Sequence, residues 1–452
     1  MKATMPSIQD IAETDEIISQ PLAIEGGPQA NPDGANQKEL FHWPIVTAED
    51  EEAILAVLRD GSMSDNKITK QFEAEYAAHL GVKFALGYAN GTMALAAAMW
   101  AVGLRRGDEL ICPSLTYWAS ALQAFSLGAT VVFADVDPDT LCLDPNDLER
   151  RVSPRTKAIM VVHNCGYPAD MDAILRLARR RQLKVIEDVS HAHGGLYRGR
   201  QVGTFGDVAA MSMMSAKSFP IGEGGMLVTD NRSIYERSLA FSHYERTRPE
   251  LTIRELKDLC APDDSPLGLA LGGVKGRMNQ TCAAMGRVQL KHYPRRMVEI
   301  QRAMNRFWDW LEGTPGIRPH RPPADSGSTM GGWYNPVGHY VPEELSGLPV
   351  ENFIEAVNAE GGRTGRGVND PLHLHPVFNQ ADIYGDGKPT RLAFAERDVR
   401  QPHGALPQAE AVGNHTFGIP WFKHDWPEAI ERYAAAYRKV ARSFAARAVA
   451  RI

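Results

Sequence analysis

The sequence predicts an α/β protein built around a largely parallel sheet that is covered by helices on both faces. From about residue 48, short apolar runs alternate with helical stretches, and turn residues bound each run. Most neighbouring runs are separated by a segment long enough for the crossover helix that parallel strands require. The predicted strands are KFALGYA, DELICPS, TVVFADV, KAIMVVHN, LKVIEDVS and VAAMSMMS.

The helical stretches have ordinary start and stop signals. AEDEEAILAVLRDG has acidic residues in its first turn and Gly61 just past its end, and KQFEAEYAAHLG stops at Gly81. MDAILRLARRRQ lies between two predicted strands, as a crossover helix should. A long helix, TCAAMGRVQLKHYPRRMVEIQRAMNRFWDWLEG, is expected to lead out of the sheet domain, and PEAIERYAAAYRKVARSFAARAV is expected to close the chain.

These patterns divide the chain into three parts. Residues 1–40 are polar and rich in Gly, Pro, Asn and Gln, which is typical of an extended N-terminal arm. We expect a large sheet domain over 41–290 and a smaller C-terminal α/β domain over 291–452. Two domains agree with a length of 452 residues.

Composition excludes several classes of function. The net charge is −6 without a clustered basic run, so a nucleic-acid partner is not expected. No apolar run approaches the ~20 residues of a membrane span, and the acidic N-terminus does not resemble a secretory signal. The five cysteines are scattered and form no C-x-x-C pair, which favours reduced thiols in a cytoplasmic protein.

The strongest chemical signal is Lys217 in MSMMSAKSFPIGEGGMLVTD. This lysine lies between an apolar strand and a glycine-rich turn that allows close backbone approach. Most lysines are solvated surface charges, but these flanks are small and apolar. Burial disfavours the ammonium form, lowers the pKa and produces a nucleophilic amine.

A carboxylate at the end of a neighbouring strand provides the second signal. KVIEDVSHAHG places Asp188 at the end of an apolar run, with His191 three residues later. Asp188 could simply cap the following segment. The alternative is that it holds the protonated nitrogen of a pyridine ring, which makes that ring an electron sink. Lys217 and Asp188 together therefore predict pyridoxal 5′-phosphate, carried by Lys217 as a Schiff base.

Two further strings agree with a phosphorylated aromatic cofactor. GYANGTMALAAAMWAVG predicts an alanine-rich helix whose N-terminus suits a phosphate, with Gly91 contributing its amide and Thr92 its hydroxyl. An N-capped helix without a ligand would have the same sequence. ICPSLTYWAS places Tyr117 where it can stack on a planar ring, although aromatic residues are more often core.

Together, these four strings resemble the DegT/DnrJ/EryC1/StrS family of sugar aminotransferases. The resemblance is densest from residue 61 to about 232 and resumes at GRMNQTCAAMGRVQL, with LAIEGGP near residue 23 similar to the family's opening. It implies the fold-type-I aminotransferase architecture. In that architecture a large domain holds a mostly parallel seven-stranded sheet flanked by helices, beside a smaller C-terminal α/β domain.

The resemblance also assigns roles to eight residues. Lys217 would carry the cofactor and Asp188 would pair with its pyridine nitrogen, while His191 would lie near the phenolic oxygen. Tyr117 would stack on the ring. The phosphate would be bound by Gly91, Thr92, Ser212 and, from the neighbouring subunit, Asn279. A homodimer with shared active sites follows from that last assignment.

The implied reaction moves an amino group from glutamate or glutamine to a keto-sugar, a nucleotide-linked keto-sugar or a keto-cyclitol. The acceptor's pocket is left open, because residues such as Trp333, Tyr334, His375, Phe378 and Trp421 fit either a binding site or small-domain core. Arg366 fits either an anion site or a solvated loop.

Three alternatives compete with transamination. Sugar dehydratases of the same family replace the lysine with histidine, so the retained Lys217 argues against them. A non-catalytic regulator or sensor on the same fold would not need Lys217 and Asp188. The H-x-H pairs at 191–193 and 373–375 lack a third and fourth ligand at a known spacing, so no metal is predicted.

Overall fold

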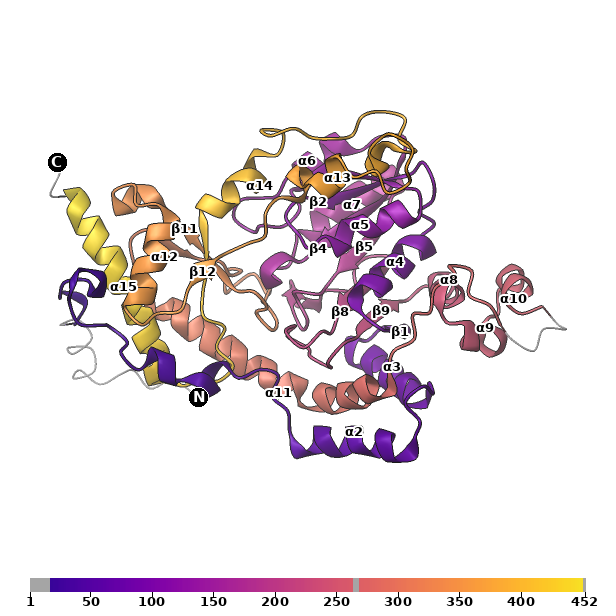
Figure 1. Cartoon of the computed structure of the whole chain (residues 1–452), viewed down its shortest axis with the longest axis horizontal. Coiled ribbons are helices and arrows are strands. Elements are labelled where there is room, and N and C mark those ends of the chain that lie inside the picture. Colours follow the sequence, from indigo (N-terminus) through magenta and orange to yellow (C-terminus); the bar gives the residue numbers. More distant parts are fainter. Residues whose placement is uncertain (1–16, 263–267, 450–452) are drawn as a thin grey trace.

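The computed structural model describes residues 17–262 and 268–449. A seven-stranded sheet forms the centre of the larger part of the molecule (Figure 1), with strand order β1-β9-β8-β5-β4-β2-β3. β9 runs antiparallel to both of its neighbours, and the other pairs are parallel. The strands are β1 (Phe84–Tyr88), β2 (Glu109–Pro113), β3 (Thr130–Ala134), β4 (Thr156–Val162), β5 (Lys184–Asp188), β8 (Val208–Ser212) and β9 (Gly225–Thr229).

This sheet confirms the predicted α/β class with a mostly parallel seven-stranded sheet. All six predicted apolar runs are strands in it, and they are almost completely buried because helices cover both faces. A two-stranded hairpin, β6 (Leu196–Tyr197) with β7 (Arg200–Gln201), lies outside the sheet. The helices of this part are α2 (Ala48–Asp60), α3 (Lys67–Leu80), α4 (Gly91–Ala101), α5 (Ala119–Ser126), α6 (Pro145–Arg151), α7 (Met171–Arg181), α8 (Arg232–Ser242), α9 (Tyr244–Glu250) and α10 (Arg254–Cys260).

Local sequence explains where several helices begin and end. Thr47 and Asp50 form a reciprocal capping box at the start of α2, and Gly61 ends that helix with φ 69°. Asn90 caps α4 by accepting a hydrogen bond from the amide of Met93 at 2.9 Å. Most side chains of α4 are buried against the sheet and against α5 and α8.

The C-terminal part is a smaller α/β unit around a four-stranded antiparallel sheet, β10-β11-β13-β12. The long helix α11 (Gln280–Trp310) connects it to the large part (Figure 1), so the expected domain division at residue 290 falls inside a helix. The remaining elements are β10 (Ile317–Pro319), β11 (Val337–Tyr340), α12 (Val350–Ala359), β12 (Gly365–Arg366), α13 (Pro376–Asn379), α14 (Pro407–Ala411), β13 (Thr416–Gly418) and α15 (Pro427–Val449).

The expected N-terminal arm lies partly outside the described residues, at 1–16. Its remainder, from residue 17, contains three short 3-10 helices and lies against the C-terminal part. The Glu360 carboxylate accepts hydrogen bonds from the amides of Ala23 and Ala30, at 2.6 and 2.9 Å, and pairs with Lys439 at 3.0 Å. The N-terminal segment is therefore anchored by backbone hydrogen bonds to the carboxylate of a buried ion pair in the C-terminal part. No helix of the described residues is long and apolar enough to cross a membrane.

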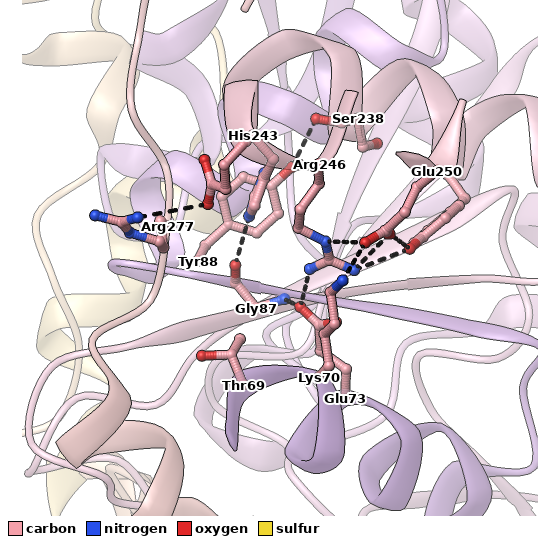
Figure 2. Close-up of polar contacts among 12 residues, drawn as sticks. Thr69, Lys70, Glu73, Gly87, Tyr88, Ser238, His243, Arg246, Glu250 and Arg277 are labelled. Carbon is pink, nitrogen blue, oxygen red and sulfur yellow. Dashed lines mark hydrogen bonds and ion pairs between the residues drawn. The ribbon is translucent and has the colours of Figure 1, made fainter. Parts of the chain in front are cut away.

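A charged cluster with Arg246 and Glu73 buried at its centre joins α3 and α9 beside β1 (Figure 2). We call Lys70, Glu73, Arg246 and Glu250 the Arg246 cluster. Arg246 contacts Glu73 at 2.8 Å and Glu250 at 2.9 Å, and Lys70 pairs with Glu250 at 2.7 Å. The Glu73 carboxylate also accepts the amide of Gly87 in β1 at 2.7 Å. Opposite charges and a backbone donor therefore satisfy the buried Arg246 and Glu73.

Candidate active site

A cavity of about 450 Å³ opens where the carboxyl ends of β5 and β8 meet the loop after β2 and the start of α4. Ligands of open α/β sheets collect at this edge. Seven of the eight predicted site residues line the cavity, although they come from positions up to 126 residues apart (217 minus 91). They are Gly91, Thr92, Tyr117, Asp188, His191, Ser212 and Lys217.

Lys217 projects into this cavity as a buried amine. Only 8% of the residue is exposed, and burial lowers the pKa of its amine to about 8, against a smaller opposing effect of Asp188. Its Nζ lies 3.9 Å from the centroid of the Tyr334 ring and has no hydrogen-bond acceptor within the described chain. The backbone is fixed by Trp43, whose indole nitrogen donates to the Lys217 carbonyl at 2.9 Å. An amine that is fixed in position and shielded from water is more often neutral, and it is therefore suited to nucleophilic chemistry.

Asp188 ends β5, and short hydrogen bonds hold its carboxylate. The Ser120 hydroxyl donates to one oxygen at 2.7 Å, and the Ser190 amide donates to the other at 3.0 Å. Thr116 lies 2.9 Å from the Ser120 hydroxyl and extends the network. Sequence reasoning missed Ser120, because its contact requires the first turn of α5 to reach the end of β5 in the folded chain. Such bonds favour the charged carboxylate and fix its orientation.

Two histidines after β5 are both held neutral by burial. His191 is packed against Tyr334, with ring centroids 4.7 Å apart, and burial and the nearby Lys217 hold its pKa well below the usual value. Its Nδ1 is buried without a hydrogen-bond partner in the described structure. His193 has its pKa lowered to about 4 by burial, and its Nε2 donates to the Ser212 carbonyl at 2.8 Å. His193 supports the cavity wall, whereas His191 faces the cavity.

The start of α4 is pressed against the end of β8. A Cβ on Gly91 would lie 2.6 Å from Cα and Cβ of Ser212, so only glycine permits this approach. The amides of Gly91 and Thr92 have no acceptor among the described residues, since Asn90 caps only Met93. Free amides at a helix N-terminus, beside the hydroxyl groups of Thr92 and Ser212, make an anion-binding corner.

Two tyrosines from opposite parts of the chain form walls of the cavity. Tyr117 follows β2 and is about half exposed, with its ring 4.9 Å from that of Trp118. Tyr334 comes from the C-terminal part, in a turn where Trp333 and Asn335 adopt left-handed φ values of 55° and 52°. The glycine-aromatic string GGWYN was the available sequence signal for this turn. Asn335 and Asn369 also line the cavity and were not predicted.

Several other residues that the sequence suggested for the active site do not line this cavity. Asn279 is exposed at the start of α11, where its side chain accepts the Thr281 amide at 2.9 Å, and it does not line the cavity of its own chain. Trp333 and Phe378 are buried in the core, and His375 caps α13. Arg366 pairs with Asp370 on the surface at 2.7 Å. Within residues 17–262 and 268–449, no group of three His, Cys, Asp or Glu side chains is arranged to hold a metal ion.

The cavity provides the groups that pyridoxal phosphate requires. It contains a buried amine without a partner, a hydrogen-bonded carboxylate, free helix-terminal amides and aromatic side chains. Fold and cavity together define a pyridoxal-phosphate-dependent enzyme of the aminotransferase class. Residues 44–414 match the model of the DegT/DnrJ/EryC1/StrS aminotransferase family, and the chain belongs to that family.

Similar proteins agree with this assignment. The chain is 32% identical to the L-glutamine:scyllo-inosose aminotransferase of Streptomyces griseus over 430 residues, which cover 93% of this chain and 97% of that protein. It is 39% identical to the GDP-perosamine synthase of Caulobacter vibrioides over 352 residues, or 75% and 89% of the two chains. The X-ray structure of an aminotransferase from Psychrobacter cryohalolentis matches with a TM-score of 0.77 and 27% identity, covering 89% of this chain and 99% of that one.

Proposed function

We propose that this enzyme transfers an amino group from glutamine or glutamate to the carbonyl carbon of a keto-cyclitol or keto-sugar. The observation that supports the chemistry most directly is the approach of two residues to one cavity: Asp188 at the end of β5, and Lys217 in the loop after β8. The acceptor class rests on the similar proteins, since a relative that covers 93% of this chain is named for scyllo-inosose, a keto-cyclitol, and for glutamine as donor.

When bound, pyridoxal phosphate supplies an electron sink that stabilises negative charge on the substrate's amino-bearing carbon. Asp188 would hold the protonated pyridine nitrogen, because its carboxylate is already oriented by Ser120 and Ser190. The phosphate would be held by the amides of Gly91 and Thr92 and by the hydroxyl of Ser212. Tyr117 would cover one ring face, and neutral His191 would lie beside the phenolic oxygen.

Lys217 would both carry the cofactor and move the proton. Its Nζ would move a proton between the substrate's amino-bearing carbon and the bound cofactor, in opposite directions in the two half-reactions. A pKa of about 8 keeps a substantial fraction of this amine neutral near physiological pH, which an ordinary lysine does not achieve. The dehydratase alternative is disfavoured, because the lysine is present and faces the cavity.

We further propose a cytoplasmic homodimer in which Asn279 reaches the partner's phosphate corner. Asn279 is exposed and lies outside its own cavity, and all five cysteines are free thiols. Mixing inactive Lys217→Ala and Asn279→Ala subunits should restore partial activity, because a mixed dimer would contain one intact site. If the subunits exchange but the mixtures recover no activity, the proposal of active sites shared between subunits would be contradicted.

The acceptor proposal is tested by separate half-reactions. Holoenzyme mixed with L-glutamine or L-glutamate should lose the visible absorption band of its cofactor. After the donor is removed, keto-inositols and keto-sugars are added individually. Return of the band with a polyhydroxylated cyclic ketone supports the proposal. Return of the band only with linear α-keto acids would contradict it.

A further inference from the structure

A second cavity of about 400 Å³ adjoins the active site. Tyr334 and Asn335 line both cavities, and Ala216, next to Lys217, lines the second. Its other walls come from the N-terminal segment and the C-terminal part, and include Phe41, Trp43, Arg363, Trp421 and Lys423. The two cavities therefore share a wall, and the second lies next to the backbone that carries Lys217.

Lys423 is buried in this second cavity without a counterion. The residue is 2% exposed, and its Nζ has no hydrogen-bond partner in the part of the chain that is described. It lies against the face of Trp421, with the Trp43 ring centroid 5.0 Å away. Aromatic faces stabilise an ammonium group but do not replace a hydrogen-bond acceptor.

Arg363 adds a second positive charge to the same cavity. Its guanidinium carbon lies 4.4 Å from the centroid of the Phe41 ring, and no described carboxylate lies within ion-pair distance. Burial and the neighbouring Arg363 together hold the pKa of Lys423 well below its usual value. The residues lining the cavity include no Asp or Glu, so two cations share it without an opposing charge.

The other buried cations are satisfied by the protein. Six lysine or arginine residues are buried in the described structure. Arg246 and Lys439 pair with carboxylates, and Arg296 and Arg391 donate to protein oxygens. Only Lys217 and Lys423 in this set lack an acceptor, and Lys217 lies where a cofactor belongs. The same feature at Lys423 indicates a second place where a ligand completes the structure.

We propose that Arg363 and Lys423 form an anion-binding subsite that holds a carboxylate or phosphate of a substrate while its reacting carbon lies beside Lys217. The inference rests on the proposed function, because it assigns this anion to one of the two substrates. The carboxylate would belong to the amino donor, and the phosphate to a phosphorylated acceptor. Arginine and lysine are the side chains that form charge-assisted hydrogen bonds with both groups.

The test compares Lys423→Met, Lys423→Arg and Arg363→Gln holoenzymes in separate half-reactions. The substrates are L-glutamine, a neutral keto-inositol and a phosphorylated keto-sugar. Losing one charge-assisted contact should raise the half-saturating concentration of the anionic substrate about 10- to 100-fold. The maximal rate should change less, and Lys423→Arg should retain part of the affinity. Arg366→Gln removes an equal charge from β12, outside this cavity, and should change nothing.

The pattern of effects identifies the source of the anion. Weaker glutamine binding with unchanged keto-inositol binding assigns the donor's carboxylate. Weaker binding of the phosphorylated acceptor alone assigns its phosphate. Unchanged half-saturation for all three substrates in Lys423→Met and Arg363→Gln would overturn the subsite. The donor half-reaction needs no acceptor, so this result is separable from failure of the proposed acceptor class.

Inorganic phosphate provides an independent test if Lys423→Met does not fold. Phosphate should inhibit the glutamine half-reaction of the wild-type enzyme competitively, and it should inhibit Arg363→Gln more weakly. Equal inhibition of both proteins would overturn the proposal, because the guanidinium would then contribute nothing to anion binding.

Discussion

The Arg246 cluster and the cavity around Lys217 are both buried and polar, but they differ in how their groups are paired. In the cluster, Arg246 contacts two carboxylates within 2.9 Å (Figure 2). In the cavity, the Lys217 amine, the His191 Nδ1 and the first amides of α4 have no acceptor or donor from the described residues. A buried polar group without a hydrogen-bond partner destabilises the fold. The presence of several such groups in one cavity therefore indicates that a bound ligand satisfies them. Between these two regions, the charges that are paired with each other belong to the scaffold, and the unpaired amine lies in the cofactor cavity.

The largest expected effect comes from removing the Lys217 amine. Lys217→Ala should lower turnover on the order of 10⁴-fold, the upper end for a general acid–base group, because the same amine carries the cofactor and moves the proton. Steady-state rates measure the loss, and thermal unfolding should show a folded protein. Full turnover in Lys217→Ala would invalidate the site.

Removing a charge from the Arg246 cluster should have the opposite effect, because it should lower stability and leave activity unchanged. Arg246→Met leaves the buried Glu73 carboxylate without its cation, which should lower the free energy of unfolding by about 3–5 kcal/mol. Denaturant unfolding measures the change, and activity per folded molecule should be retained. Adding Glu73→Gln should recover part of the loss. If Arg246→Met were as stable as wild type but had an altered substrate preference, the Arg246 cluster would be part of the active site and not of the scaffold.

Asp188→Asn should weaken catalysis without removing the cofactor. The amide keeps the shape of the side chain and loses the charge that would hold the pyridine nitrogen protonated. Loss of one such electrostatic contact should reduce turnover about 10²- to 10³-fold. Cofactor content and turnover are measured on the same preparation, with Asp172→Asn as a surface control. Equal rates for Asp188→Asn and wild type would exclude the assigned role.

The pH dependence of cofactor capture gives the smallest but most specific effect. Apoenzyme captures pyridoxal phosphate through neutral Lys217, so the rate should rise with pH around a midpoint of about 8. Asp188 raises the pKa of Lys217, so Asp188→Asn should move the midpoint to lower pH. Stopped-flow absorbance measures both curves. A wild-type midpoint near 10.5 would show that the amine is not desolvated.

Much of this fold was predictable because strands buried on both faces have continuous apolar sequences. Lys217, Asp188 and Gly91 could be assigned to the cavity from sequence, since each follows or precedes an apolar run at the edge where ligands collect. Ser120 and Tyr334 could not, because their contacts depend on how distant elements pack. The string WFKHDWP likewise gives no indication that Lys423 is buried and unpaired. Whether a buried polar group has a hydrogen-bond partner depends on which distant residues the folded chain brings beside it.

Trapping the cofactor on the protein shows directly whether Lys217 carries it. Holoenzyme is reduced with borohydride, digested and mapped by mass spectrometry. We expect the cofactor label on the peptide that contains Lys217, and we expect its loss in Lys217→Ala. A label on Lys423, the other buried lysine without an acceptor, or on a surface lysine would contradict it.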